Sequence, residues 1–119
     1  MTDRLPRLLL HAEGAAVAAA AIAVYFDAGY VWWVLLVLAL APDLSAIGYI
    51  GGPRVGARCY DAAHTYCGPV VLAAIGVLAD ADATIQVSLI WIGHIGVDRM
   101  LGYGLKYMSG FKDTHLQRV

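Results

Sequence analysis

Charged side chains are scarce in this chain of 119 residues: Asp, Glu, Lys and Arg make up 14% of it, whereas 61% is hydrophobic. A soluble domain of this length needs a polar shell that so few charges cannot supply. The formal net charge of -1 and the lack of a Lys/Arg cluster also argue against a nucleic-acid partner. The composition instead predicts a membrane protein whose partner is the lipid bilayer.

Cysteine is scarce too, and the two present, Cys59 and Cys67, fall on one predicted helix. A spacing of eight residues separates their Cα atoms by roughly 12 Å, whereas a disulfide needs them within about 7 Å. We therefore expect no bridge within a straight helix and interpret both as small core residues. The N-terminal apolar run also lacks a small-residue cleavage box before Asp27, which argues against a cleaved signal peptide.

Four long apolar segments fill most of the chain. Each is close to the roughly 20 residues that a helix needs to cross about 30 Å of hydrocarbon. Gly, Pro or Asp residues mark the short joints between them, so neighbouring helices are expected to run antiparallel. The sequence thus predicts an all-α fold, a single four-helix transmembrane bundle over residues 1–119. Its predicted helices cover residues 8–27, 31–50, 57–78 and 85–107.

The charges at the ends of these segments alternate in sign. Basic residues in short loops stay preferentially on the cytoplasmic side of a membrane. The acidic residues fall at the first and third joints, at Asp27, Asp80 and Asp82. The basic residues fall at the N-terminus, the second joint and the C-terminus, at Arg4, Arg7, Arg54, Arg58, Lys106, Lys112 and Arg118. This pattern predicts that both termini are cytoplasmic.

The predicted helices are apolar in their outer halves and carry ionisable residues in their inner halves. These ionisable residues are His11, Glu13, Asp43, Asp61, His64, His94, Asp98 and Arg99. Counted from the nearest basic residue at ~1.5 Å per residue, five of them lie at depths of roughly 6–18 Å, namely His11, Asp43, His64, His94 and Asp98. They form a single band in which side chains from four helices could meet.

The spacing within individual helices supports such a meeting. Residues three or four apart share a helix face, so His94 and Asp98 can both point into the bundle. The same holds for Asp61 and His64. Arg99 lies about 100° around the helix from its neighbour and is expected to snorkel or to pair elsewhere.

The band needs a proton, an arginine or a metal to neutralise it, because a buried ion costs about 2.5–3.5 kcal/mol even on the lenient insertion scale. A divalent cation would offset two carboxylates and use the imidazole lone pairs at the same time. Imidazole with carboxylate suits zinc, iron or manganese better than calcium or magnesium, and zinc is the first choice. The predicted metal ligands are His11, Asp43, His64, His94 and Asp98.

These polar residues also have structural interpretations. Histidines inside a membrane commonly hydrogen-bond to a neighbouring helix, and His94 and Asp98 could satisfy one another. Glu13 and Asp61 are expected nearer the interface, where they could be solvated or paired with arginine. Pro42 could kink the second helix and free carbonyl groups at that depth, and the same kink could open a cavity.

Three stretches of sequence resemble a known family. They read PDLS with GY over residues 42–49, YDAAHTY over 60–66, and HIGVDR followed by GYGLKY over 94–107. Over nearly the whole chain the sequence resembles the small bacterial membrane family catalogued as domain of unknown function 4260. The resemblance implies a bacterial inner-membrane location and no stated activity.

A fainter resemblance is to inner-membrane metal-dependent hydrolases, which carry an early His, a Pro-Asp-x-Asp, a His-x-x-x-x-His and a late His-x-x-x-Asp in that order. Two positions depart from this pattern, since Ser45 stands for the second Asp and Cys59 for the first His. Those changes imply a different metal, one metal instead of two, or no hydrolysis. The positions to which the resemblance gives a metal-binding role are His11, Asp43, His64, His94 and Asp98.

The first functional hypothesis is a membrane-embedded metal-dependent hydrolase that acts on a lipid or other amphiphile from the cytoplasmic leaflet. The metal would acidify a bound water, and Asp43, Asp61 or Glu13 would move the proton. The second hypothesis is an ion, proton or metal transport protein, for which the outer half offers little beyond Gln86 and Ser88. The third is a structural or accessory module. A homo-oligomer is compatible with all three.

Overall fold

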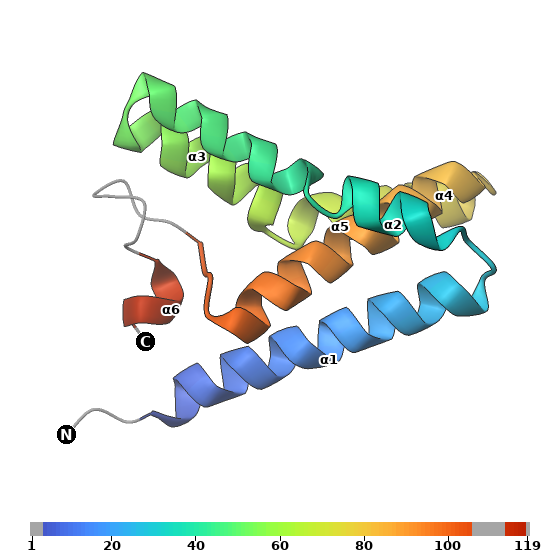
Figure 1. Cartoon of the computed structure of the whole chain (residues 1–119), viewed down its shortest axis with the longest axis horizontal. Helices are drawn as coiled ribbons and strands as arrows, with labels where there is room; N and C mark the ends of the chain where they lie inside the picture. The colour runs from blue at the N-terminus through green and yellow to red at the C-terminus, as the bar shows by residue number, and fades with distance from the viewer. Residues whose placement is uncertain (1–3, 106–113, 119) are drawn as a thin grey trace.

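A computed structural model describes residues 4–105 and 114–118 (Figure 1). Within these ranges the chain is helical and holds no β-strand, which confirms the predicted all-α class. Helix α5 is central, because it lies along α1 and also contacts α4 and α2. The elements are α1 (Leu5–Asp27), α2 (Trp32–Leu38), the 3-10 helix η1 (Ala41–Gly51), α3 (Pro53–His64), α4 (Cys67–Leu78), α5 (Asp82–Leu101) and α6 (His115–Arg118).

The second crossing segment is not one helix over residues 31–50 but two pieces, α2 and η1. Pro42 has no N–H with which to continue an α-helical ladder, and the chain tightens into η1 at this point. The Asp43 N–H donates to the carbonyl of Leu40 at 3.1 Å. In an α-helix that N–H would have paired with the carbonyl of Ala39, which is thereby released. The kink expected at the proline is confirmed.

The third crossing segment is also broken, into α3 and α4, where the sequence predicts one helix over residues 57–78. Thr65 adopts an extended conformation with φ -91° and ψ 146°, so α3 ends at His64. Pro69, in the first turn of α4, has no N–H with which to continue a ladder back to Thr65. The break leaves His64 at a helix terminus, where its carbonyl needs a partner from elsewhere.

The fourth crossing segment is α5, which ends at Leu101 rather than at the expected residue 107. Gly102 stops the helix with φ +99°, a left-handed conformation that glycine adopts without steric cost. The short helix α6 follows, and no periodic pattern in the sequence predicts it. The predictions made for Lys106 and Lys112 lie outside the described residues.

Three segments are long and apolar enough to cross a membrane, namely Leu5–Asp27, Trp32–Gly51 and Pro53–Leu78. Helix α5 also has the length, with 20 residues, but it carries three charged side chains, Asp82, Asp98 and Arg99. It is the helix that the other segments surround. These features are those of an integral membrane protein with a helical bundle.

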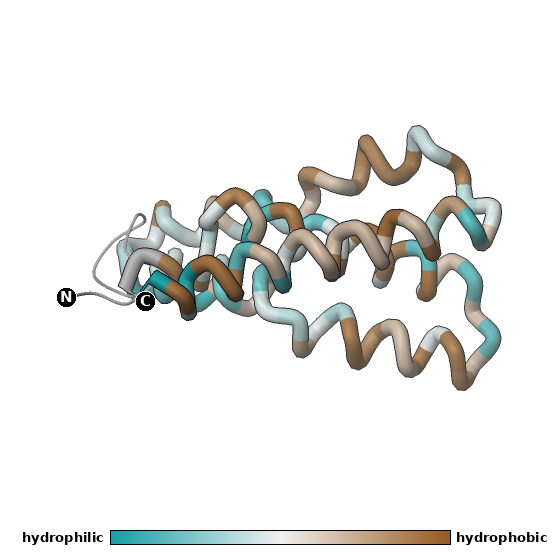
Figure 2. Tube along the Cα trace, turned by 90° about the horizontal axis from the view of Figure 1, so that it is seen from below, coloured by the Kyte–Doolittle hydropathy of each residue, from teal (hydrophilic) through white to brown (hydrophobic). Residues whose placement is uncertain are grey.

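Apolar residues, brown in Figure 2, occur along all the crossing segments, and many of their large side chains are exposed on the bundle. Leu36 on α2 is 62% exposed and Leu78 on α4 is 85% exposed. Such exposure is unfavourable in water and ordinary in lipid. Cys59 and Cys67 are exposed free thiols as well, which corrects their interpretation as core residues.

Helices α1 and α5 approach each other through small residues. A Cβ atom added to Gly14 would lie 2.7 Å from the backbone nitrogen of Met100, and one added to Gly96 would lie 2.7 Å from that of Ala18. Only glycine allows the two backbones to come this close, as small residues do at many membrane helix interfaces. This contact fixes the rotation of α5 and thereby the directions of its polar side chains.

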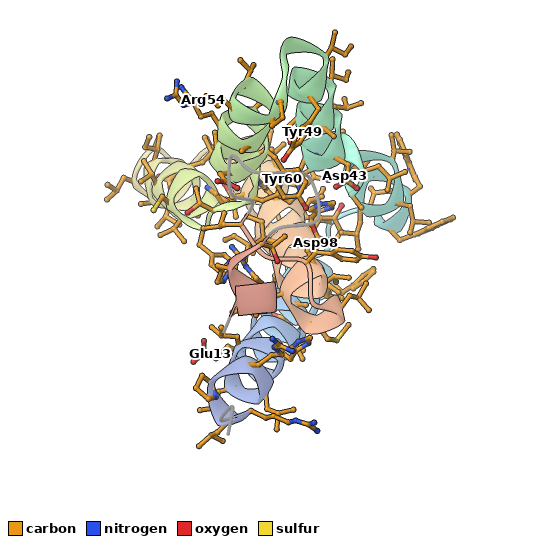
Figure 3. All side chains as sticks on the ribbon, turned by 90° about the vertical axis from the view of Figure 1, so that its left-hand side faces the viewer. Glu13, Asp43, Tyr49, Arg54, Tyr60 and Asp98 are labelled. Carbon is orange, nitrogen blue, oxygen red and sulfur yellow. The ribbon has the colours of Figure 1, made fainter. Side chains whose placement is uncertain are left out.

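The crossing segments alternate in direction, so α1 begins and α5 ends at the same end of the bundle (Figure 1). Helix α6 lies at that end too. Figure 3 views the bundle from this end and labels Arg54, at the start of α3. The chain crosses the bundle twice between the start of α1 and the start of α3. The basic residues at these two starts therefore share one end of the bundle.

Candidate metal centre

Four ionisable side chains from three elements come together beside α5. Asp43 comes from η1, His64 is the last residue of α3, and His94 and Asp98 lie one turn apart on α5. One ligand atom from each lies within 4.8 Å of the other three. Figure 3 labels the two carboxylates near the centre of the bundle. We call these four residues the His/Asp cluster.

The ligand atoms of the His/Asp cluster have spacings that suit a small cation. Nε2 of His64 lies 3.3 Å from an oxygen of Asp43 and 3.3 Å from one of Asp98. Nε2 of His94 lies 3.2 and 3.1 Å from the same two oxygens, and the two Nε2 atoms are 3.2 Å apart. Ligands at about 2.0 Å from a tetrahedral ion are roughly 3.3 Å from one another. These five spacings therefore fit a zinc-sized ion.

Both imidazole rings are held so that their Nε2 lone pairs face the cluster. Nδ1 of His64 donates to the carbonyl of Tyr60 at 2.8 Å, and Nδ1 of His94 donates to the carbonyl of Ala39. A neutral ring that donates from Nδ1 has an unprotonated Nε2. Oδ2 of Asp98 is likewise buried and makes no hydrogen bond to the described residues. These facing acceptors are favourable only around a cation or a shared proton.

The breaks in the crossing segments supply the groups that orient these rings. The α-helical hydrogen-bond pattern is interrupted at Pro42, so no backbone N–H pairs with the carbonyl of Ala39 there. That carbonyl is therefore free to accept from His94. The ring of Tyr60 stacks on that of His64, with centroids 3.7 Å apart and an interplanar angle of 5°. Outer-shell contacts of this kind fix the tautomer and orientation of metal-binding histidines.

The His/Asp cluster is closed on three sides and open on the fourth. The side chains of His64 and His94 are 2% and 7% exposed, and that of Asp98 is 17% exposed. Asp43 is 50% exposed, so it faces the open side. A small cation, a water or a substrate would therefore reach the cluster past Asp43.

The sequence predicts His11 as a fifth ligand, but the structure places it outside the cluster. Its Nδ1 lies 2.8 Å from the carbonyl of Met100, near the end of α5. His11 precedes Gly14 by three residues and shares its face of α1, which packs directly against α5. The ring is thus used at the α1–α5 interface and does not reach η1 or α3.

The two carboxylates expected to move protons also lie outside the His/Asp cluster. Glu13 is exposed and lines a separate cavity on the α1 side of α5. Asp61 is partly buried one turn before His64 on α3, and its carboxylate does not join the cluster. Of the three predicted proton carriers, only Asp43 is in place to act there.

A narrow apolar cavity adjoins the His/Asp cluster. It has a volume of about 220 Å³ and is lined by apolar side chains of α2, η1, α3 and α5. Two of its lining residues, Pro42 and Ala63, directly precede the cluster residues Asp43 and His64 in the chain. Trp91 lies one turn before His94 and donates from its indole to the carbonyl of Ala63 at 2.5 Å. The cavity and the cluster therefore share their walls.

Sequence reasoning missed the groups that support the site. The carbonyl of Ala39, the Tyr60 ring and the Trp91 indole each hold a part of it in place. Pro42 was the only available signal, since a proline inside an apolar helix removes the hydrogen bond to the carbonyl four residues earlier and so disturbs the pairing of the carbonyls beside it. Aromatic residues near a histidine give no comparable signal, because apolar helices contain many of them.

Comparison with known proteins identifies a family but no relative of known function. A family model described as Domain of unknown function (DUF4260) matches residues 7–119. No curated protein matches the chain, and no solved structure does. The matched range includes the whole His/Asp cluster.

Proposed function

Since the chain belongs to the family described as Domain of unknown function (DUF4260), which states no activity, we propose from the geometry alone that it is a membrane-embedded metal-dependent enzyme. One observation carries the proposal: two histidines and two aspartates direct potential ligand atoms at one point, with both imidazoles held through Nδ1. Structural polar contacts between helices normally pair a donor with an acceptor. Here four acceptors converge, which supports a cation as their common partner.

The donor set supports a transition metal. Two imidazoles and two carboxylates match the preferences of zinc, iron and manganese, whereas calcium and magnesium prefer oxygen-only ligands. Zinc remains the first choice, because the spacings between ligand atoms are close to those of a tetrahedral site. The cluster includes no cysteine, so the proposed site has no thiol ligand.

The proposed reaction is hydrolysis. A divalent metal held by His64, His94 and Asp98 would leave a coordination position for a water, whose pKa it would lower to supply a nucleophile near neutral pH. These three are the less exposed members of the cluster, and the surrounding structure orients both imidazole rings. Asp43 is the most exposed member, so it is the group placed to accept the proton of the water and return it to the leaving group.

The proposed substrate is a lipid or another amphiphile. The apolar cavity beside the cluster, of about 220 Å³, would accept part of an aliphatic chain between Leu38 and Trp91. A polar group attached to that chain would then lie next to the exposed side chain of Asp43. This arrangement supports a substrate that is apolar at one end and hydrolysable at the other.

We further propose that the bundle lies in a bacterial inner membrane with both termini in the cytoplasm. Arg4 and Arg54 lie at the starts of α1 and α3, at one end of the bundle. Asp27, Asp80 and Asp82 lie at the joints of the other end. Arginine in short loops favours the cytoplasmic side, which supports substrate entry from the cytoplasmic leaflet.

The arrangement of polar groups favours an enzyme over a transport pathway. In the outer half, the amide of Gln86 donates to the hydroxyl of Tyr25 at 3.0 Å. Ser88 donates to the carbonyl of Thr84 at 2.7 Å. Each of these groups thus has a partner in its own part of the bundle. Neither continues the His/Asp cluster toward the other end of the bundle. Flux of protons or divalent metals through liposomes that depends on Asp43 would favour transport instead.

The first experiment is metal analysis of the purified full-length protein. We expect close to one equivalent of zinc, iron or manganese in the wild type and none in a His94→Ala/Asp98→Ala double variant. His11→Ala is the matched control, because this histidine lies outside the cluster, and it should retain the metal. Equal and negligible metal in the wild type and the double variant, after growth with each metal, would end the proposal.

The second experiment tests hydrolysis. The metal-loaded protein in neutral detergent is incubated with a panel of short-chain ester and phosphoester lipids, and the products are resolved by mass spectrometry. Asp43→Asn should reduce turnover by about 10²-fold or more, which is the usual contribution of a general base. Metal binding without turnover of any lipid in the panel would contradict the enzymatic part and leave a metal-binding or metal-transporting membrane protein.

A further inference from the structure

A second and larger cavity lies at the C-terminal end of α5, against α1. It has a volume of about 500 Å³, within the range of small-molecule sites. Residues of α1, of the α3–α4 break, of α5 and of α6 line it, and none of them belongs to the His/Asp cluster. Its polar side chains are Glu13, Thr65, Tyr66, Arg99 and His115.

Arg99 is the buried cation of this cavity. The residue is 8% exposed, so of the two expectations for it, snorkelling to the interface or pairing elsewhere, the structure shows the second. Its guanidinium donates to the carbonyl of His64 at 3.0 Å and lies 3.3 Å from Nδ1 of His115. The carbonyl of His64 carries no charge. The ring of His115 favours its neutral form, because burial and the positive charge of Arg99 lower its pKa. Nδ1 of that ring accepts from the N–H of Leu105 at 2.7 Å.

The charge of Arg99 has no close counterion in the part of the chain that the structure describes. No carboxylate oxygen of residues 4–105 or 114–118 lies within 4.0 Å of its guanidinium. Asp98 and Asp61 act on the charge of Arg99 only from beyond that distance. Glu13 lines the same cavity but is exposed, so solvent screens its charge. A buried cation without a close counterion is unfavourable. An anion in the cavity would remove this cost.

The cavity also offers a hydrogen-bond donor beside the guanidinium. The hydroxyl of Tyr66 is buried and has no hydrogen-bond partner among the described residues. The ring of Tyr66 lies beside the Arg99 guanidinium, at 5.9 Å from its centroid. A cation with a fork of N–H groups and a nearby hydroxyl is a combination that binds phosphate oxygens.

We propose that this cavity binds the phosphate group of a phosphate ester, with Arg99 as the counterion and the Tyr66 hydroxyl as a second donor. Two sources share this chemistry, a phospholipid headgroup and a soluble phosphate. Arg99 lies in the last turn of α5, packed against Gly14 of α1, and the cavity is also lined by His115 of α6. The site is independent of the proposed metal, since it shares no side chain with the His/Asp cluster.

The test measures phosphate binding to the full chain in neutral detergent by calorimetry. Inorganic phosphate and a short-chain phosphatidic acid are the two probes. We expect at least one of them to bind, and Arg99→Gln to weaken that binding by tenfold or more, because a charge-assisted hydrogen-bond pair is lost. Binding of the lipid alone assigns a headgroup site, and comparable binding of both assigns a soluble phosphate site. Failure of both probes to bind the wild type would overturn the proposal.

Two matched variants separate this site from general charge effects and from the metal. Glu13→Gln also changes a charge on the cavity wall and should retain phosphate binding, since its carboxylate is exposed. Asp43→Asn changes the His/Asp cluster and should retain it as well. Equal affinity of the wild type and Arg99→Gln would show that Arg99 is not the binding group.

Arg99→Gln removes a buried contact to α3 and could fail to fold, so a measurement on the wild type is needed as well. Phenylglyoxal modifies arginine side chains, and peptide mass spectrometry reports the rate at each position. We expect a saturating concentration of the probe that binds to slow modification of Arg99 several-fold, while Arg54 on the outside of α3 reacts at an unchanged rate. No difference in protection between the two arginines would contradict the proposal.

Discussion

The Nε2 atoms of His64 and His94 lie 3.2 Å apart, and each ring is held by a hydrogen bond between its Nδ1 and a backbone carbonyl. The rings come from different helices, α3 and α5, so the protein brings two lone pairs together across a helix interface. Such proximity is unfavourable unless a proton or a cation lies between them. The tests of the proposed site follow from this relationship.

Metal removal should destabilise the folded protein. A metal that binds the folded chain and not the unfolded chain adds stability, by about 2.7 kcal/mol when its free concentration is 100 times the dissociation constant. We expect a chelator to lower the Tm of the protein in detergent and zinc to restore it. His94→Ala/Asp98→Ala should show the same Tm with and without chelator. A wild-type Tm that does not respond to chelator or zinc would contradict this prediction.

Restoring the helix at Pro42 should weaken metal binding without touching a ligand. In Pro42→Ala an N–H becomes available, so the α-helical ladder can extend from α2 toward Asp43 and engage the carbonyl of Ala39. His94 then loses the acceptor that orients its ring. Loss of an outer-shell partner typically lowers metal affinity by about 10–100-fold. Competition with a chromogenic chelator measures the affinity.

Pro53→Ala provides the matched control for this prediction. Pro53 is the first residue of α3, where the missing N–H would be unpaired in any case, and it lies away from the His/Asp cluster. This variant should bind metal like the wild type. Equal losses of affinity in both proline variants would show that the effect is on folding and not on the orientation of His94.

The sequence predicts the depth of each polar residue but not the rotation of each helix. Counting residues from the helix ends placed His11, His64 and His94 in one band, and three of the four helices do contribute to the cluster. His11 is absent because α1 turns the face of Gly14 toward α5. That rotation depends on the close backbone packing at Gly96, which no periodicity of the sequence specifies.

The breaks and the last helix show a second limit of sequence reasoning. Two apolar runs of the right length predict two continuous helices, and prolines alone do not say whether a helix bends or divides. At Pro42 the chain becomes a 3-10 helix, and before Pro69 it becomes extended. Helix α6 has four residues, too few for any periodic pattern. The fold class and the crossing segments were thus predictable, whereas the joints that shape the site were not.

Adding one methyl group at the α1–α5 contact should destabilise the bundle. In Gly96→Ala the new Cβ would lie 2.7 Å from the backbone nitrogen of Ala18 and 2.9 Å from the carbonyl oxygen of Gly14, so a helix must shift. Overpacking of this kind costs typically about 1–3 kcal/mol. Gly93→Ala is the matched control, because its Cβ would meet only the Cβ of Ala21 at 3.8 Å. Unfolding in mixed detergent micelles compares the two free energies, and similar values would contradict the predicted contact.

Protonation of His115 should loosen the contact between α6 and the rest of the bundle. Burial, followed by the positive charge of Arg99, lowers the pKa of this imidazole in the folded state below its ordinary value of ~6.5. Between the lowered value and the ordinary one, the unfolded chain binds the proton more readily than the folded chain. Stability is therefore full above about pH 6.5 and falls as the pH drops toward the lowered pKa.

The measurement is the Tm of the wild type and of His115→Gln from pH 8 to pH 5, with chelator present so that loss of metal from the His/Asp cluster does not contribute. Glutamine can still accept the hydrogen bond from the N–H of Leu105 but does not titrate in this range. The difference in Tm between wild type and variant should therefore change in the acidic half of the range, with the wild type losing more. If the difference stays constant with pH, or if the wild type gains stability on acidification, then Arg99 does not act on His115 as its 3.3 Å contact requires.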